Sequence, residues 1–186
     1  MRELSLNILD IAENSFKAKA KKVEIFVIAN EDFLTITVKD DGCGMEEEFL
    51  KRVTDPFTTT RTTRKVGMGI PLIKMQSELC EGKFSIESKK GVGTTLTASF
   101  KTNHIDRPPL GDIAETIVSL IADLKGTELS FFFSAFGEEF SLSTEEIKEQ
   151  LGDEIPIDSP EILIFIRDLI KENIKINFGG FSLWKV

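Results

Sequence analysis

The chain has 186 residues, of which 41% are hydrophobic, so it can bury a substantial core as one large or two small domains. Its apolar runs fall far short of the roughly 20 residues that a membrane-spanning helix needs, and no signal-peptide pattern opens the sequence, so we expect a cytoplasmic protein. The two cysteines and the single histidine lack the spacing of a disulfide framework or a zinc site. We therefore expect free thiols.

Acidic and basic residues are distributed unevenly between the two halves of the sequence. Residues 1–102 carry 15 acidic and 16 basic residues (+1), whereas residues 103–186 carry 16 acidic and 7 basic residues (−9). The step coincides with Pro108-Pro109, which ends regular structure. We therefore predict one domain over residues 1–102 and an acidic α+β module of unknown role over residues 103–186. The acidic half argues against nucleic-acid or anionic-membrane binding, and the lysine-rich run over residues 17–22 is a local exception.

The first predicted element is a helix from Leu4 to Phe16, whose apolar residues fall mostly at helical spacings. At about 100° per residue, a group of polar residues gathers on the opposite side of this helix. They are Asp10, Glu13, Asn14 and Lys17. Periodicity alone leaves open whether this polar face is solvated or binds a ligand.

Alternating apolar residues over 23–29 and 34–38 then predict two strands, most simply joined as a hairpin. The second strand runs into Asp40-Asp41-Gly42-Cys43-Gly44, where glycines spaced by one residue favour a sharp turn that another group can approach closely. A short helix over 45–53 follows. The hydroxyl-rich, basic stretch over residues 54–65 is typical of a surface loop.

Gly67-Met68-Gly69 precedes a predicted helix over about 70–81, whose free N–H groups suit a phosphate. Strands over 84–88 and 96–100 follow, separated by the tight turn Gly91-Val92-Gly93. This order of elements predicts an α+β fold, a two-layer sandwich in which helices cover one face of a mixed, mostly antiparallel sheet.

The second half predicts helices over 110–125, 144–151 and 160–175, with strands over 128–134 and 139–142. Its strands hold a group of aromatic residues that either pack in a small core or form a docking surface for a partner. These residues are Phe131, Phe132, Phe133, Phe136 and Phe140.

Five short motifs occur in an order that resembles the GHKL superfamily, the Bergerat-fold ATP-binding domains of gyrase, the ninety-kilodalton heat-shock chaperone, histidine kinases and MutL. The motifs are Asp10-x-x-x-Asn14, Asp40-x-Gly42-x-Gly44, Asp55-Pro56-Phe57-x-Thr59-Thr60, Gly67-x-Gly69 and Gly91-x-Gly93-Thr94. They are similar to the N, G1, F, G2 and G3 boxes of that superfamily. The resemblance covers about residues 1–102 and says nothing about the rest.

The resemblance implies that ATP and Mg²⁺ are the ligands. Asp40 would accept a hydrogen bond from the adenine amino group, reinforced by Thr94, and Asn14 would bind Mg²⁺ through its amide oxygen. Glycines would let the nucleotide approach the backbone or cradle its phosphates, namely Gly42, Gly44, Gly67, Gly69 and Gly93. The remaining implied contacts are Lys17, Phe57, Thr59, Arg61, Arg64 and Lys65.

Some positions depart from the superfamily pattern. Asp10 stands where hydrolysing members carry a glutamate, so we take it as the candidate general base, with Glu13 in reserve. Lys17 and Asp55-Pro56-Phe57 favour the histidine-kinase branch, whereas residues 12–15 resemble the MutL type. No helix bearing a phospho-accepting histidine precedes the first motif, and His104 lies after the last strand of the domain. We therefore expect any phosphoryl acceptor to lie on another protein.

Two hypotheses of function follow. The first is a regulatory ATPase or protein kinase that acts on a partner protein, similar to the stand-alone kinases of the anti-sigma type, which phosphorylate serine. The alternative is a non-catalytic nucleotide switch, or an accessory subunit, in which ATP binding orders residues 54–66 and changes what the second module binds. The sequence names no partner and leaves a homodimer open.

Overall fold

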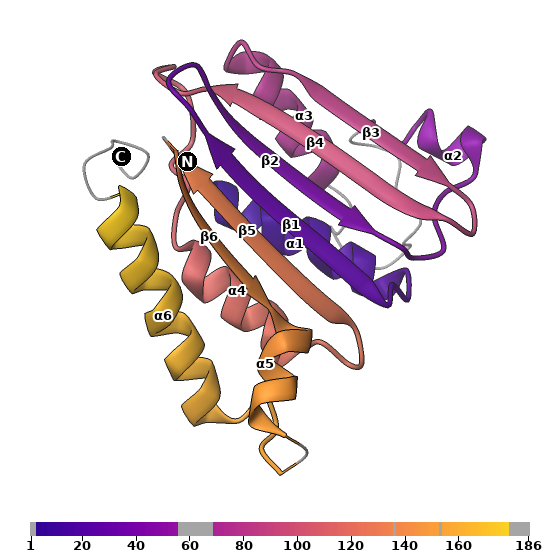
Figure 1. The fold of residues 1–186 in the computed structure, drawn as a ribbon. Coiled ribbons are helices and arrows are strands. Elements are labelled where there is room, and N and C mark those ends of the chain that lie inside the picture. The colour runs from indigo at the N-terminus through magenta and orange to yellow at the C-terminus, as the bar shows by residue number, and fades with distance from the viewer. Residues whose placement is uncertain (1–2, 56–68, 136, 153, 179–186) are drawn as a thin grey trace.

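The computed structural model describes residues 3–55, 69–135, 137–152 and 154–178 (Figure 1). The elements are α1 (Leu4–Lys17), β1 (Lys22–Ala29), β2 (Phe33–Asp40), α2 (Glu47–Leu50), α3 (Gly69–Leu79), β3 (Phe84–Lys89), β4 (Gly93–Lys101), α4 (Ile113–Ala122), β5 (Glu128–Ala135), β6 (Glu138–Ser143), α5 (Thr144–Leu151) and α6 (Pro160–Phe178). The helix predicted over residues 45–53 is shorter than expected, because the chain turns after Leu50.

All of these strands belong to one six-stranded sheet with the order β3-β4-β2-β1-β5-β6. β1 pairs with β5 in parallel, from Lys22 opposite Glu128 to Ala29 opposite Ala135, and the other neighbouring pairs are antiparallel. The predicted α+β fold with a mixed, mostly antiparallel sheet is confirmed. The same sheet contains strands from both sides of the charge step at residue 103, which lies in the connection between β4 and α4.

Helices cover one face of this sheet, and Figure 1 shows α1, α3 and α4 behind the strands. The strands alternate accordingly: Val23, Ile25 and Val27 of β1 are buried, while Phe26 lies on the opposite face against Phe132 of β5, with ring centroids 6.1 Å apart. Burying one face of each strand is what a period-two apolar pattern achieves.

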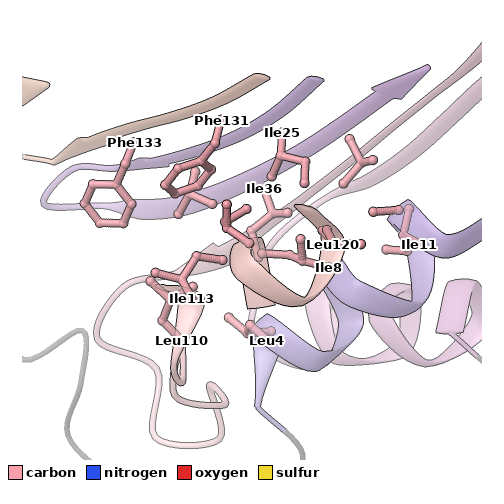
Figure 2. Packing of buried hydrophobic residues seen from close by; sticks show 14 of the residues in the cluster. Leu4, Ile8, Ile11, Ile25, Ile36, Leu110, Ile113, Leu120, Phe131 and Phe133 are labelled. Carbon is pink, nitrogen blue, oxygen red and sulfur yellow. The ribbon is translucent and has the colours of Figure 1, made fainter. Parts of the chain in front are cut away.

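The core joins both halves of the sequence. Figure 2 shows Leu4, Ile8 and Ile11 of α1 with Ile113 and Leu120 of α4, packed under side chains of the sheet, and all of them belong to one cluster of buried residues. Phe131 and Phe133 are buried in that cluster, so for these two the core interpretation of the phenylalanine group is confirmed. Phe136 lies outside the described residues.

Residues of the second half hold both ends of α1. The N–H groups of Leu4 and Ser5 donate to the carbonyl oxygens of Pro109 (3.0 Å) and Leu110 (2.8 Å), which satisfies two of the N–H groups that a helix start leaves without an internal acceptor. Just beyond the other end, the buried hydroxyl of Thr127 donates to the carbonyl oxygen of Ala20 at 2.8 Å. The position of α1 therefore depends on residues that follow the charge step.

Both cysteines are free, as predicted: Cys43 is exposed, and Cys80 is buried, which raises the pKa of its thiol. Within the residues that the structure describes, no helix combines the length and apolar character needed to cross a bilayer.

Candidate functional site

Asp40 ends β2 with its carboxylate held in place by two hydrogen bonds. The Ser15 hydroxyl donates to one carboxylate oxygen, Oδ2, at 2.7 Å, and the N–H of Gly42 donates to the other, Oδ1, at 2.8 Å. The next residue, Asp41, accepts from the N–H groups of Lys21 and Lys22 at 2.7 and 2.8 Å, which fixes the turn beside the start of β1. Each carboxylate oxygen has two lone pairs, so the fixed Asp40 can accept further hydrogen bonds.

A narrow cavity of about 70 Å³ opens beside Asp40. Its walls are mostly apolar and include Ile11, Val38, Ile70, Ile86 and Leu96, while Asn14 and Thr94 add polar groups. Apolar walls with a few fixed polar groups are the usual lining of a small-molecule site, although such sites usually have volumes of about 300–1,000 Å³. A single carboxylate among such walls suits a planar heterocycle that carries an amino group, because the amino group donates while the ring contacts the apolar walls.

Glycines around Asp40 are required by the packing of the backbone. Gly44 has φ +63°, and a Cβ there would lie 2.1 Å from the carbonyl oxygen of Lys89. A Cβ on Gly93 would lie 2.0 Å from the carbonyl oxygen of Asp40, and one on Gly42 would lie 2.9 Å from Ala18. These contacts bring the Asp40 turn, the β3–β4 turn and the end of α1 together. Gly44 also lines the Asp40 cavity, and the ligand contacts of Gly42 and Gly44 stay predictions.

Hydroxyl groups extend the polar part of the site. Thr94 is the register partner of Asp40 in the β2–β4 ladder, and its hydroxyl lies 2.8 Å from that of Ser88. Ser88 also accepts from the N–H of Met45 at 2.9 Å. Sequence reasoning missed Ser15 and Ser88; the signal for Ser15 was a hydroxyl at a buried position of α1, as at Ser5, directly after Asn14.

The polar face of α1 divides between two places. Asn14 lines the Asp40 cavity, and Asp10 packs against the start of α3, since a Cβ on Gly69 would lie 3.1 Å from the Cβ of Asp10. Glu13 and Lys17 form an ion pair of 2.9 Å and line a different cleft, which the α4–β5 turn helps to form. The structure thus places Asn14 at the Asp40 cavity, Asp10 against Gly69 at the start of α3, and Glu13 and Lys17 beside another cleft.

The start of α3 adds a group of N–H donors to the site. The helix begins at Gly69, and Ile70 in its first turn lines the Asp40 cavity. A helix N-terminus carries free N–H groups and a partial positive charge, and both favour an anion. The arrangement therefore suits a ligand with a heterocycle at one end and anionic groups at the other.

Several predicted contacts lie outside the described residues: Phe57, Thr59, Arg61, Arg64, Lys65 and Gly67. Among the residues that are described, no group of three or more His, Cys, Asp or Glu side chains is placed to hold a metal ion. Mg²⁺ is usually held by one or two protein oxygens together with phosphate oxygens and waters. Asn14 is an exposed residue, and its amide oxygen is a ligand of the type that such a site uses.

A family model described as "Histidine kinase-, DNA gyrase B-, and HSP90-like ATPase" matches residues 1–104. The chain belongs to this family. The match includes all of the elements around the Asp40 cavity, from α1 to β4, and it confirms the resemblance that the five motifs carry. Domains of this histidine kinase-like ATPase family bind ATP.

Curated relatives within the family include sensor kinases. A probable C4-dicarboxylate sensor kinase of Halalkalibacterium halodurans is 33% identical over 94 residues, which are 49% of this chain and 18% of that protein. Sporulation kinase E of Bacillus subtilis is 33% identical over 112 residues, 58% of this chain and 15% of that protein. The sensor histidine kinase YxdK of Bacillus subtilis is 31% identical over 106 residues, 53% of this chain and 33% of that protein. The similarity thus spans a third or less of the length of these relatives.

A solved structure, the N-terminal domain of a DNA repair protein, shares the fold. It aligns with a TM-score of 0.53 at 15% identity and covers 77% of this chain and 53% of its own. The structural similarity covers more of the chain than the family match does, so it extends beyond residue 104.

Proposed function

We propose that the protein binds Mg-ATP in the Asp40 cavity and acts as a regulatory ATPase or protein kinase on a partner protein. The observation that carries the proposal is the Asp40 carboxylate, held by Ser15 and Gly42 at the mouth of an apolar cavity that also contacts the first turn of α3. Membership of the histidine kinase-like ATPase family supports ATP as the nucleotide.

In this proposal the adenine amino group donates to Asp40, and the phosphates extend toward Asn14 and Gly69. Asn14 would contribute its amide oxygen to Mg²⁺, which neutralises part of the phosphate charge when bound. Lys17 is paired with Glu13, so a contact with phosphate requires its side chain to change rotamer. The contacts predicted from residues 57–67 remain predictions.

Asp10 is the proposed base. Its side chain packs against the start of α3, so it lies beside the N–H groups that would hold the phosphates. There it would accept the proton of the attacking hydroxyl or water. Glu13, the reserve candidate, already accepts a hydrogen bond from Lys17 at 2.9 Å and faces the other cleft.

The alternative is a non-catalytic switch or an accessory subunit that controls a partner complex. The length of Asp10 favours this reading, because an aspartate reaches one methylene less far than the glutamate of hydrolysing relatives, and packing against Gly69 limits its movement. In that case bound ATP would change the surface offered to a partner without being consumed.

Phosphate release from Mg-ATP by the full chain, measured with and without proteins that co-purify with it, separates the two functions. We expect Asp10→Asn to lose turnover and to keep ATP affinity, while Asp32→Asn, in the exposed β1–β2 turn, changes neither. Tight ATP binding without turnover, and without label transfer to any partner, would favour the switch. Loss of turnover in Glu13→Gln instead of Asp10→Asn would show that Asp10 is not the base.

A further inference from the structure

A second cleft, of about 530 Å³, lies where the end of α1 meets the α4–β5 turn. Glu13, Phe16, Lys17 and residues 19–21 form one side, and residues 123–127 form the other. It shares no lining residue with the Asp40 cavity. The volume lies within the range of about 300–1,000 Å³ that is usual for small-molecule sites.

The cleft is basic in an acidic protein. Its charged residues are four lysines and two acids: Lys17, Lys19, Lys21, Lys125, Glu13 and Asp123. Both acids are already paired, Glu13 with Lys17 at 2.9 Å and Asp123 with Lys125 at 2.7 Å. Within the described part of the chain, neither Lys19 nor Lys21 forms an ion pair. The cleft thus has a surplus of two positive charges, whereas the whole chain has a net charge of −8.

Two of these lysines have a backbone conformation that disfavours a side chain. Lys19 has φ +58° and Lys125 has φ +48°; apart from them, Glu81 is the one described non-glycine residue with positive φ. Glycine adopts this conformation without steric cost, whereas other residues are strained by roughly 1 kcal/mol or more. Lys19 caps the end of α1, where its N–H donates to the carbonyl oxygen of Phe16 at 3.0 Å, and Lys125 lies in the α4–β5 turn. Glycine would therefore fit both positions and remove only the charge.

Apolar groups complete the cleft. Phe16, Ala20 and Leu124 line it between the lysines, so that a bound molecule would meet an aromatic ring as well as ammonium groups. Lysine ammonium groups bind phosphates as strongly hydrated point charges. We propose that this cleft is a second ligand site, which binds a small molecule carrying two or more linked phosphate groups.

Amide chemical shifts of the full chain locate such a site directly. With pyrophosphate as the probe, we expect saturable shifts at residues 19–21 and 125–127, in addition to any at the start of α3. The same experiment distinguishes two ligands that carry linked phosphates. A nucleoside diphosphate would also shift the amide signals next to Phe16, because its base would contact the ring, whereas pyrophosphate would not.

The double variant Lys19→Gly/Lys125→Gly tests whether these two ammonium groups bind the ligand, and it should leave the fold intact. Glycine fits both backbone conformations, so the melting temperature should stay equal or rise, while pyrophosphate affinity at the cleft falls about tenfold or more. Glu81→Gly relieves the third positive φ outside the cleft and is the matched control, with pyrophosphate affinity unchanged.

Three results would overturn the proposal. The first is a set of shifts confined to the Asp40 cavity and the start of α3. The second is unchanged pyrophosphate affinity in the stable double variant. The third is tighter binding of an acidic peptide than of pyrophosphate at residues 19–21 and 125–127, which would make the cleft a protein-docking surface.

Discussion

The Ser15 hydroxyl donates a hydrogen bond of 2.7 Å to the Asp40 carboxylate and so joins α1 to the end of β2. Ser15 is 3% exposed, which keeps water from competing for this bond. Since Asn14 is the neighbour of Ser15 in sequence, the bond also fixes the place of the Asn14 backbone relative to the carboxylate. The two ends of the proposed nucleotide site are therefore set by one contact.

Asp40→Asn should weaken Mg-ATP binding by about tenfold to a hundredfold, because a hydrogen bond to a charged acceptor contributes about 1.5–3 kcal/mol. The protein should remain folded, since asparagine has nearly the same shape, and its amide oxygen can accept from the N–H of Gly42 while its NH2 group donates to the Ser15 hydroxyl oxygen. Titration calorimetry measures the affinity, and thermal melting checks the fold. Asp41→Asn, at the adjacent exposed position, is the control and should bind as the native chain does. Native affinity in a folded Asp40→Asn protein would remove Asp40 from the site.

Ser15→Ala should affect both stability and binding. Loss of a buried donor costs about 1 kcal/mol of unfolding free energy, and the freed carboxylate should bind Mg-ATP about threefold to tenfold more weakly. Ser77→Ala is the matched control, since Ser77 is also buried in a helix but donates to the Lys74 carbonyl oxygen. Urea unfolding and calorimetry of both variants separate the effects. An equal loss of affinity in Ser77→Ala would attribute the change to general destabilisation.

Gly44→Ala should destabilise the protein far more than Gly91→Ala. Both glycines have positive φ, +63° and +75°, so each substitution should cost about 1 kcal/mol in backbone strain. A Cβ at Gly44 would additionally lie 2.1 Å from the Lys89 carbonyl oxygen, whereas one at Gly91 would meet nothing within 4 Å. We expect a further loss of about 2 kcal/mol or more for Gly44→Ala, measured by urea unfolding. Equal losses would contradict the close approach of the two turns.

Glu128 should contribute a pH-dependent part of stability. Burial raises the pKa of Glu128, but hydrogen bonds from Lys148 and Thr144 and the charge of Lys148 outweigh burial and lower the pKa below 4.5. A group whose pKa is lower in the folded state stabilises that state above the unfolded-state pKa, and this contribution is lost as pH falls through the folded-state value. The side chains of Glu128 and Lys148 are about one-third exposed, so we expect less than about 1 kcal/mol.

Urea unfolding of Glu128→Gln, compared with the native chain at neutral pH and at about pH 4, measures this contribution. The variant should be less stable at neutral pH, and the difference should shrink in acid. Glu139→Gln, at an exposed position of β6, is the control and should follow the native pH dependence. A difference that stays constant with pH would mean that ionisation of Glu128 is not involved.

Local patterns in the sequence predict most of the elements. The helical spacing before Lys17 and the alternation over 23–29 each place an element within a few residues of its position. The parallel pairing of β1 with β5 could not be predicted in this way, because no local signal joins strands that far apart in sequence. The change in charge at residue 103 was the basis for predicting a domain boundary there. Charged residues lie mainly on the surface, so their distribution does not reveal that strands from both halves pair in one sheet.

The family motifs led to some residues that line the Asp40 cavity, but not to others. Asp40 and Asn14 line one cavity as the motif order indicated. Ser15 was missed because a small hydroxyl in an apolar stripe has the pattern of a packing residue. The cleft around Lys19 and Lys125 joins residues that are far apart in sequence, and the lysine-rich run over residues 17–22 alone did not indicate what it faces.

Because α1 is held at both ends by residues after the charge step, an event far from the nucleotide can alter the nucleotide site. A partner that displaced α4 or the α4–β5 turn would strain the hydrogen bonds between α1 and the carbonyl oxygens of Pro109 and Leu110, and the one that Thr127 donates to Ala20. The resulting shift of α1 would carry Asp10 and Asn14 with it. Thermodynamic reciprocity then requires that the nucleotide change the affinity for that partner by the same factor. If the proposed function holds, the acidic half would then respond to nucleotide occupancy without contacting the nucleotide.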